Sequence, residues 1–88
     1  MMRIEYGNKF LKSVQKLPFE QQEKLDALLE VFSANPYDTS LHTKKLTGTL
    51  TGFFSFRISR DWRVIFSFID PVTVRVVLAK HRKDIYRI

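Results

Sequence analysis

The stretch from residue 53 to residue 80 holds three short runs of aromatic and β-branched residues, the types most favoured in β-strands. The polar or proline-containing breaks between them, at 59–61 and 70–72, are typical of tight turns. The sequence therefore predicts strands at 53–58, 62–69 and 73–80, joined as an antiparallel meander.

These strands are expected to have one apolar face, because successive residues of a strand point to opposite sides of the sheet. The even-numbered positions supply a continuous hydrophobic surface that needs a cover. They are Phe54, Phe56, Ile58, Val64, Phe66, Phe68, Val74, Val76 and Leu78. One side of the meander is therefore predicted to belong to the core.

The odd-numbered face carries a basic cluster if both turns are centred in the breaks. Arg57 then lies opposite Arg63. Across the second turn, Arg63 lies opposite Ala79 and diagonal to His81. The sequence therefore predicts that Arg57, Arg63 and His81 share one face at one end of the meander.

The N-terminal part predicts a short strand at 2–6 and two amphipathic helices. Asn8 is expected to cap a helix that runs to about residue 16. A second helix is expected to have Pro18 in its first turn and to stop at Asn35–Pro36, with apolar residues spaced i, i+3, i+4, i+7. These are Leu25, Leu28, Leu29 and Phe32. Residues 37–51 are expected to form a loop.

Together these elements predict a single α+β domain over residues 1–88, in which two N-terminal helices pack on a mainly antiparallel sheet. The expected order is strand, helix, helix and a three-stranded meander. A short tail at 81–88 is expected to form a helical turn.

Charge is distributed unevenly along the chain. Residues 1–40 hold five Lys or Arg against six Asp or Glu, whereas residues 41–88 hold ten against three. A basic surplus on the strand half is typical of a surface that binds nucleic acid or an acidic partner. The alternative is a charged, soluble surface without a specific ligand.

Several classes of function are disfavoured by composition. The chain has no cysteine, which excludes disulfides and thiol chemistry, and two histidines without a paired acidic motif argue against a metal site. No apolar run approaches the roughly 18 residues of a membrane-spanning helix, and no signal peptide is apparent. We expect a soluble cytoplasmic protein that does not contact a membrane.

Short motifs spread along nearly the whole chain resemble those of the RelE/ParE superfamily of toxins from toxin–antitoxin pairs. Their order and spacing carry the resemblance more than any one of them. They are Lys16-Leu17-Pro18, Asn35-Pro36, Lys45-Leu46-Thr47-Gly48, residues 52–58, residues 61–66 and residues 81–87.

The resemblance implies the RelE-like toxin fold and a toxin neutralised by a cognate antitoxin. RelE-like members enter the ribosomal A site and cut mRNA there without a cofactor, whereas ParE-like members inhibit DNA gyrase. Operator DNA would be bound only through the toxin–antitoxin complex. A third hypothesis is an inactive member that binds only antitoxin and operator DNA.

For the RelE-like branch, the resemblance implies a catalytic set of Arg57, Arg63, His81 and Tyr86. The two arginines would stabilise the charge that develops on phosphorus when the RNA 2′-hydroxyl attacks. His81 would serve as general acid, and Tyr86 would stack on a base or assist proton transfer.

The general base stays open, because Lys44 and Lys45 occupy the region where some members have an acidic residue or histidine. Lys44, Lys45, Arg82 and Lys83 are expected to bind substrate.

Each of these residues also has an ordinary structural interpretation. A single exposed arginine is usually solvated, but two arginines on opposite strand positions repel unless an anion or acid lies between them. His81 alone would be a surface histidine, and Tyr86 would pack the tail onto the sheet. Asp61 is expected to pair with Arg60 or Arg63 rather than to act as a base.

Overall fold

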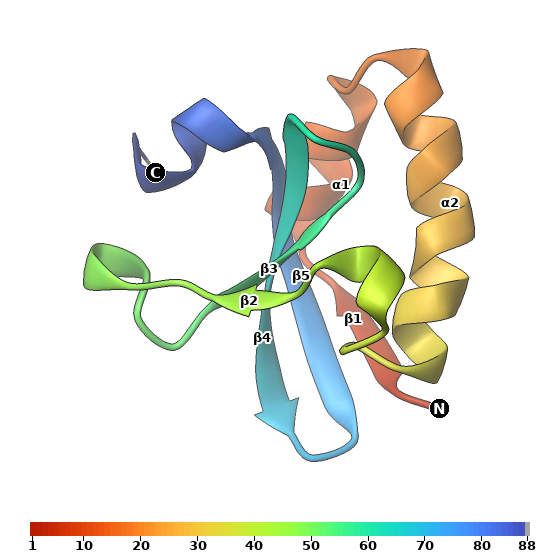
Figure 1. Ribbon diagram of the computed structural model, residues 1–88, viewed down its shortest axis with the longest axis vertical. Coiled ribbons are helices and arrows are strands. Elements are labelled where there is room, and N and C mark those ends of the chain that lie inside the picture. Colours follow the sequence, from red (N-terminus) through yellow and green to blue (C-terminus); the bar gives the residue numbers. More distant parts are fainter. Residues whose placement is uncertain (88) are drawn as a thin grey trace.

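The computed structural model describes residues 1–87 and contains a five-stranded sheet covered on one face by two helices (Figure 1). The strand order is β1-β5-β4-β3-β2, with β1 parallel to β5 and the other pairs antiparallel. The elements are β1 (Arg3–Tyr6), α1 (Asn8–Gln15), α2 (Phe19–Ala34), β2 (Lys44–Lys45), β3 (Phe54–Arg57), β4 (Trp62–Asp70) and β5 (Thr73–His81). The predicted fold class and all three strands of the meander are confirmed.

The helix boundaries differ slightly from those predicted. Gly7, not Asn8, is the N-cap of α1 and supplies no side-chain oxygen. Gly7 suits this position because a Cβ there would lie 3.2 Å from the Val76 carbonyl oxygen. Pro18 precedes α2 as its N-cap instead of occupying its first turn, and Asn35 is the C-cap as expected.

The main core lies between the sheet and the helices. Phe32 of α2 is fully buried, with its ring centroid 4.8 Å from those of both Phe56 and Phe66. Leu25 is buried in the same cluster, and Leu28 and Leu29 pack against it. The apolar stripe of α2 and the even-numbered face of the meander therefore meet as predicted, with one exception.

The exception is Leu78, which lies on the other face because β5 contains a bulge. Ile65 pairs with Leu78 and Phe66 with Val76, so Val77 has no partner on β4. An extra residue in one strand reverses the parity of every residue beyond it. Ala79 consequently takes the core position expected for Leu78, and Leu78 points to the outer face.

A second apolar cluster on that outer face holds the loops against the sheet. It contains Leu46, Ile65, Leu78 and Ile85, each less than a tenth exposed. Ile85 belongs to a 3₁₀ segment, η3 (Arg82–Arg87), which confirms the helical turn expected in the tail. The cluster thus fixes η3 and the loop that follows β2 on the side of the sheet opposite α2 (Figure 1).

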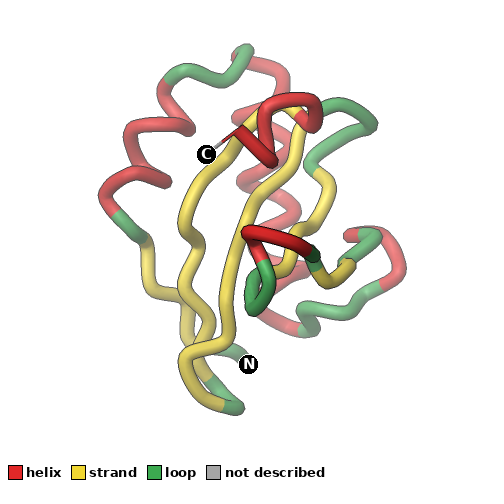
Figure 2. The backbone as a smooth tube through the Cα atoms, turned by 90° about the vertical axis from the view of Figure 1, so that its left-hand side faces the viewer, coloured by secondary structure: helices red, strands yellow, loops and turns green. Residues whose placement is uncertain are grey.

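The region predicted as a loop at 37–51 holds more structure than expected. It contains β2, which pairs with β3, and two short 3₁₀ segments, η1 (Thr39–Leu41) and η2 (Gly48–Leu50). Figure 2 shows this segment folded beside the edge of the sheet. Within residues 1–87, neither helix is long and apolar enough to cross a bilayer.

Candidate active site

A cleft of about 380 Å³ opens on the outer face of the sheet, between β2, β4 and η3. Four of its seven lining residues are cationic, and no carboxylate of residues 1–87 lines it. The lining residues are Lys44, Leu46, Arg63, Arg82, Lys83, Ile85 and Tyr86. Leu46 and Ile85 belong to the second apolar cluster, so the packing of that cluster positions the backbone that carries these cations.

Arg63 lies at the base of this cleft and is paired across the sheet with Arg57, as predicted. Arg63 is only 7% exposed. The Nε atoms of both arginines are buried without a hydrogen-bond partner. The Arg63 guanidinium donates one bond, from Nη2 to the Arg60 carbonyl oxygen at 3.3 Å.

The surroundings of Arg63 disfavour its own positive charge. Burial lowers its pKa most, and the charges of Arg57 and Arg82 lower it further, while Asp61 acts in the opposite direction. Among the described residues, neither Arg57 nor Arg63 forms an ion pair. A buried cation costs free energy unless it is paired, so this pair is preorganised for an anion.

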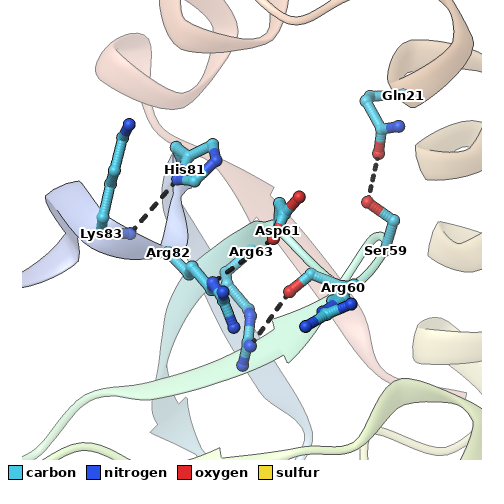
Figure 3. A network of polar contacts seen from close by, with 8 residues as sticks. All are labelled: Gln21, Ser59, Arg60, Asp61, Arg63, His81, Arg82 and Lys83. Carbon is cyan, nitrogen blue, oxygen red and sulfur yellow. Dashed lines mark hydrogen bonds and ion pairs between the residues drawn. The ribbon is translucent and has the colours of Figure 1, made fainter.

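Asp61 does not neutralise either arginine expected to pair with it. Its carboxylate lies 3.3 Å from Arg82 Nε, and its carbonyl oxygen accepts a hydrogen bond from the Arg82 backbone N–H at 2.7 Å (Figure 3). The expectation that Asp61 pairs with Arg60 or Arg63 is therefore wrong. Its contacts instead fix the start of η3 beside the cleft.

His81 lies on the other side of the sheet from Arg63, which corrects the predicted arrangement. The bulge places His81 opposite Trp62 and Lys80 opposite Arg63. The His81 ring packs edge-on against Trp62, with centroids 5.1 Å apart, and its Nδ1 accepts a hydrogen bond from the Lys83 N–H at 3.3 Å. Figure 3 shows this ring pointing away from the Arg63 guanidinium.

Tyr86 and three of the four expected substrate-binding residues line the cleft. Tyr86 is 55% exposed, and its hydroxyl accepts a long hydrogen bond of 3.5 Å from the Thr47 N–H. Lys44 lines the cleft, but Lys45 is paired with Phe54 and so shares the helix-side face of the sheet. The structure therefore brings together Arg57, Arg63, Lys44, Arg82, Lys83 and Tyr86, and it places Lys45 and His81 elsewhere.

Two polar residues near the arginine pair were not singled out from the sequence. Lys80 is the cross-strand partner of Arg63, which only a register with the bulge reveals. Ser55 is buried beside the cleft, and its hydroxyl has no partner. In the sequence, Ser55 alternates with Phe54 in a predicted strand, so it looked like an ordinary outward-facing residue.

The arrangement is suited to binding phosphate. Arg57 and Arg63 supply buried donors, while the lysines and Arg82 raise the local positive potential. Within residues 1–87, no cluster of histidine, cysteine or acidic residues is arranged to hold a metal ion. The lining side chains besides arginine that can exchange a proton are Lys44, Lys83 and Tyr86.

Comparison with solved structures shows close similarity in fold over almost the whole chain. YafQ from Escherichia coli matches with a TM-score of 0.78 and 19% identity, covering 98% of this chain and 99% of its own. A YoeB/ParE toxin from Agrobacterium tumefaciens matches with a TM-score of 0.74 and 17% identity, covering 91% and 98%.

A third solved structure, the archaeal RelE–RelB complex from Pyrococcus horikoshii, matches with a TM-score of 0.73 and 22% identity, covering 92% of this chain and 94% of the other. No protein-family model and no curated protein sequence matches. At these identities the similarity establishes architecture, which agrees with the motifs noted in the sequence. The chain therefore has the fold of the RelE/ParE toxin superfamily.

Proposed function

We propose that this protein is the toxin of a toxin–antitoxin pair and that it cuts mRNA on the ribosome. The observation that carries the proposal is the Arg57–Arg63 pair beside a cationic cleft. Arg63 is buried at its base, and the Nε atoms of both arginines have no partner. A protein gains nothing in stability from such a pair, so a phosphate ligand is the simplest reason for it.

The cleavage reaction transfers a phosphoryl group within the RNA. The 2′-oxygen attacks the adjacent phosphorus and loses its proton, and the bond from phosphorus to the 5′-oxygen breaks as that oxygen gains a proton. Arg57 and Arg63 stabilise the extra negative charge on the phosphoryl oxygens. Tyr86 and Lys44 lie in the same cleft and are the proposed proton carriers.

The role of His81 as general acid stays a prediction, and the register of β4 and β5 argues against it. A general acid must come within hydrogen-bond reach of the leaving oxygen, and His81 lies on the opposite face from Arg63. It would contribute to this step only if the substrate passed around the edge of β5.

An inhibitor of DNA gyrase, as in the ParE-like branch, is the second candidate function. The observation that favours it is that no histidine or carboxylate lines the cleft among the described residues. An inhibitor needs a cationic surface but no proton-transfer groups.

The two candidates are separated by what happens to message and DNA after the protein is induced. Discrete breaks within translated codons, mapped by primer extension, support RNA cleavage. DNA damage with intact message supports gyrase inhibition and overturns the nuclease proposal.

The arginine pair is tested by single-turnover cleavage of ribosome-bound mRNA. Arg63→Ala is expected to slow cleavage by about 10²–10³-fold, the typical loss for one donor that stabilises transition-state charge. Lys24→Ala is a suitable control because Lys24 is exposed on α2, away from the cleft. Equal rates for Arg63→Ala and the parent would remove the arginine pair from the mechanism.

We also propose a cognate antitoxin as the partner protein. Solved structures with this fold include the RelE–RelB and YoeB–YefM complexes, whose chains match this one over 92% of its length. The basic surplus of residues 41–88 suits an acidic partner segment.

A further inference from the structure

A second cavity, of about 370 Å³, lies on the helix side of the sheet between α1 and the free end of β5. Its rim carries Lys9 and Lys12 of α1, the α1 C-cap Lys16 and Lys80 of β5, and all four are exposed. The α1 lysines are spaced i, i+3 and i+7, so they follow one stripe of the helix. The cavity is thus bordered by a row of cations.

These lysines have no neutralising partner in the part of the chain that the structure describes. None of them forms an ion pair, and Asp84 is the one carboxylate that lines the cavity. The Asp84 carboxylate already lies 3.9 Å from Arg87 Nη1. Excess positive charge around a cavity favours a ligand with several negative charges.

The wall of the cavity is aromatic. Trp62 and His81 both line it and pack edge-to-face against each other. Both residues are partly exposed. Accessible ring surface beside a row of cations is typical of sites that bind single-stranded nucleic acid, because bases stack on the rings while phosphates meet the cations.

The edge of β5 is closed to an added peptide strand at this point. Strand β1 ends at Tyr6, opposite Val76, so it leaves the last part of β5 unpaired on that side. The Ser13 hydroxyl of α1 fills the gap, because it accepts a hydrogen bond from the Ala79 N–H at 2.9 Å. A partner that binds by strand addition would have to displace α1, which disfavours an extended peptide as the occupant.

Lys80 connects this cavity with the cleft on the other face. The register makes it the cross-strand neighbour of Arg63, yet it also lines the second cavity, because β5 is the edge strand here. Lys80 therefore lies between two groups of cations, Arg57 and Arg63 on one side and the lysines that border the cavity on the other. An arrangement of this kind fits a regularly charged polymer that bends around the edge of β5.

We propose that the cavity between α1 and β5 binds the phosphodiester backbone of single-stranded RNA, continuing the path of the strand held at Arg57 and Arg63. This inference rests on the proposed function, since it extends the RNA from the cleft to a second site. Lys12 and Lys16 contact phosphates, and the His81 ring stacks on a base.

The test measures binding of fluorescein-labelled 2′-O-methyl oligouridylates, which cannot be cleaved because the attacking hydroxyl is blocked. A long probe of about 12 nucleotides spans both sites, and a short probe of about 4 nucleotides fits only one. Affinities are measured by fluorescence anisotropy over a series of salt concentrations for the parent and for Lys12→Gln/Lys16→Gln.

The matched control is Arg3→Gln/Lys24→Gln, which loses the same charge at exposed positions outside both cavities. For the long probe, Lys12→Gln/Lys16→Gln should reduce the slope of log affinity against log salt by about 1.4, the value for two lost phosphate contacts on a single strand. The control should change that slope much less. His81→Ala should weaken the long probe by about fivefold or more without changing the slope.

Three results would overturn the proposal. The first is that the parent protein fails to bind the long probe at low salt, and the second is that the two double variants show equal salt slopes. The third result is that Lys12→Gln/Lys16→Gln weakens the binding of polyglutamate as much as the binding of RNA. The last would show a site for acidic protein instead. Failure here is separable from failure of the proposed function, which is judged by cleavage of ribosome-bound message by Arg63→Ala and parent. A protein that cuts nothing but shows the expected slopes would keep this site and lose the nuclease assignment.

Discussion

At the scale of single residues, the most informative side chain is Arg63. Its burial and its two cationic neighbours both disfavour its charge, and the nearby Asp61, which pairs with Arg82, offsets this only in part. The charge of Arg63 therefore lowers the stability of the folded state. Because arginine is a cation throughout the neutral range, the cost of burying it does not vary with pH there.

Replacing Arg63 with an apolar residue of similar length should therefore stabilise the protein while abolishing its function. Arg63→Met removes a poorly paired buried charge and keeps most of the buried volume, so the free energy of unfolding should rise by about 1 kcal/mol or more. Urea unfolding measures this change, with the exposed Arg60→Met as control. A less stable Arg63→Met protein would show that the guanidinium is satisfied in the folded state.

At the scale of elements, the bulge at Val77 decides which side chains meet. The first hairpin has no irregularity, so Arg57 and Arg63 pair as the alternation of the sequence predicts. In the second hairpin, one extra residue moves His81 and Leu78 to the faces opposite those predicted. Val77 sits in a run of β-branched and aliphatic residues without glycine or proline, so nothing local marks the bulge.

The remaining differences between the sequence-based prediction and the structure arise from contacts between residues far apart in the sequence. Leu46 and Ile85 are far apart in the sequence, and their burial on the outer face depends on how the loop and η3 fold over the sheet. Strand β2 has two residues and exists because it pairs with β3. Local patterns predicted the layers and the core, whereas the walls of the cleft required the tertiary structure.

The register of β4 and β5 can be tested by disulfide formation. Val64→Cys/Ala79→Cys places two thiols on residues that are paired across the strands, within the Cα separation of roughly 4.4–6.8 Å that a disulfide allows. Val64→Cys/Leu78→Cys corresponds to the register without a bulge and places the thiols on opposite faces. Mild oxidation followed by mass spectrometry should show a crosslink in the first variant alone. A crosslink in the second variant alone would show that β5 has no bulge at Val77.

The packing of α2 on the sheet gives a second prediction at this scale. Phe66 is fully buried among Phe32, Phe54, Phe56 and Phe68. Phe66→Ala should lower the free energy of unfolding by about 3–5 kcal/mol, which threatens a small domain whose total stability is about 5–15 kcal/mol. Thermal melting measures the loss, and Ile69→Ala, at a position 45% exposed, serves as the control. Similar melting of Phe66→Ala and the parent would contradict the assignment of the core face.

At the scale of the whole molecule, the two layers have different electrical characters. Residues 1–40 are nearly balanced in charge, whereas residues 41–88, which form most of the sheet and the cationic cleft beside η3, carry the surplus. The helix layer nevertheless adds the α1 lysines beside the end of β5. Positive potential is therefore concentrated at one end of the molecule, around η3 and the free edge of β5.

That concentration makes a prediction about the antitoxin that we propose as partner. An acidic segment approaching this end is accelerated by long-range attraction, and dissolved ions screen the attraction over about 10 Å at 0.1 M salt. The association rate should therefore fall steeply as ionic strength rises, while the dissociation rate changes less, because it depends on contacts already formed.

Stopped-flow mixing of this protein with the proposed antitoxin at several salt concentrations measures both rates. Lys12→Gln/Lys16→Gln should flatten the salt dependence of association because it removes charge from the end that attracts the partner. Arg3→Gln/Lys24→Gln removes the same charge elsewhere and should flatten it less. An association rate that does not respond to salt would mean that the antitoxin docks on a surface away from the basic end, and the apolar helix layer would then be the place to look for its contacts.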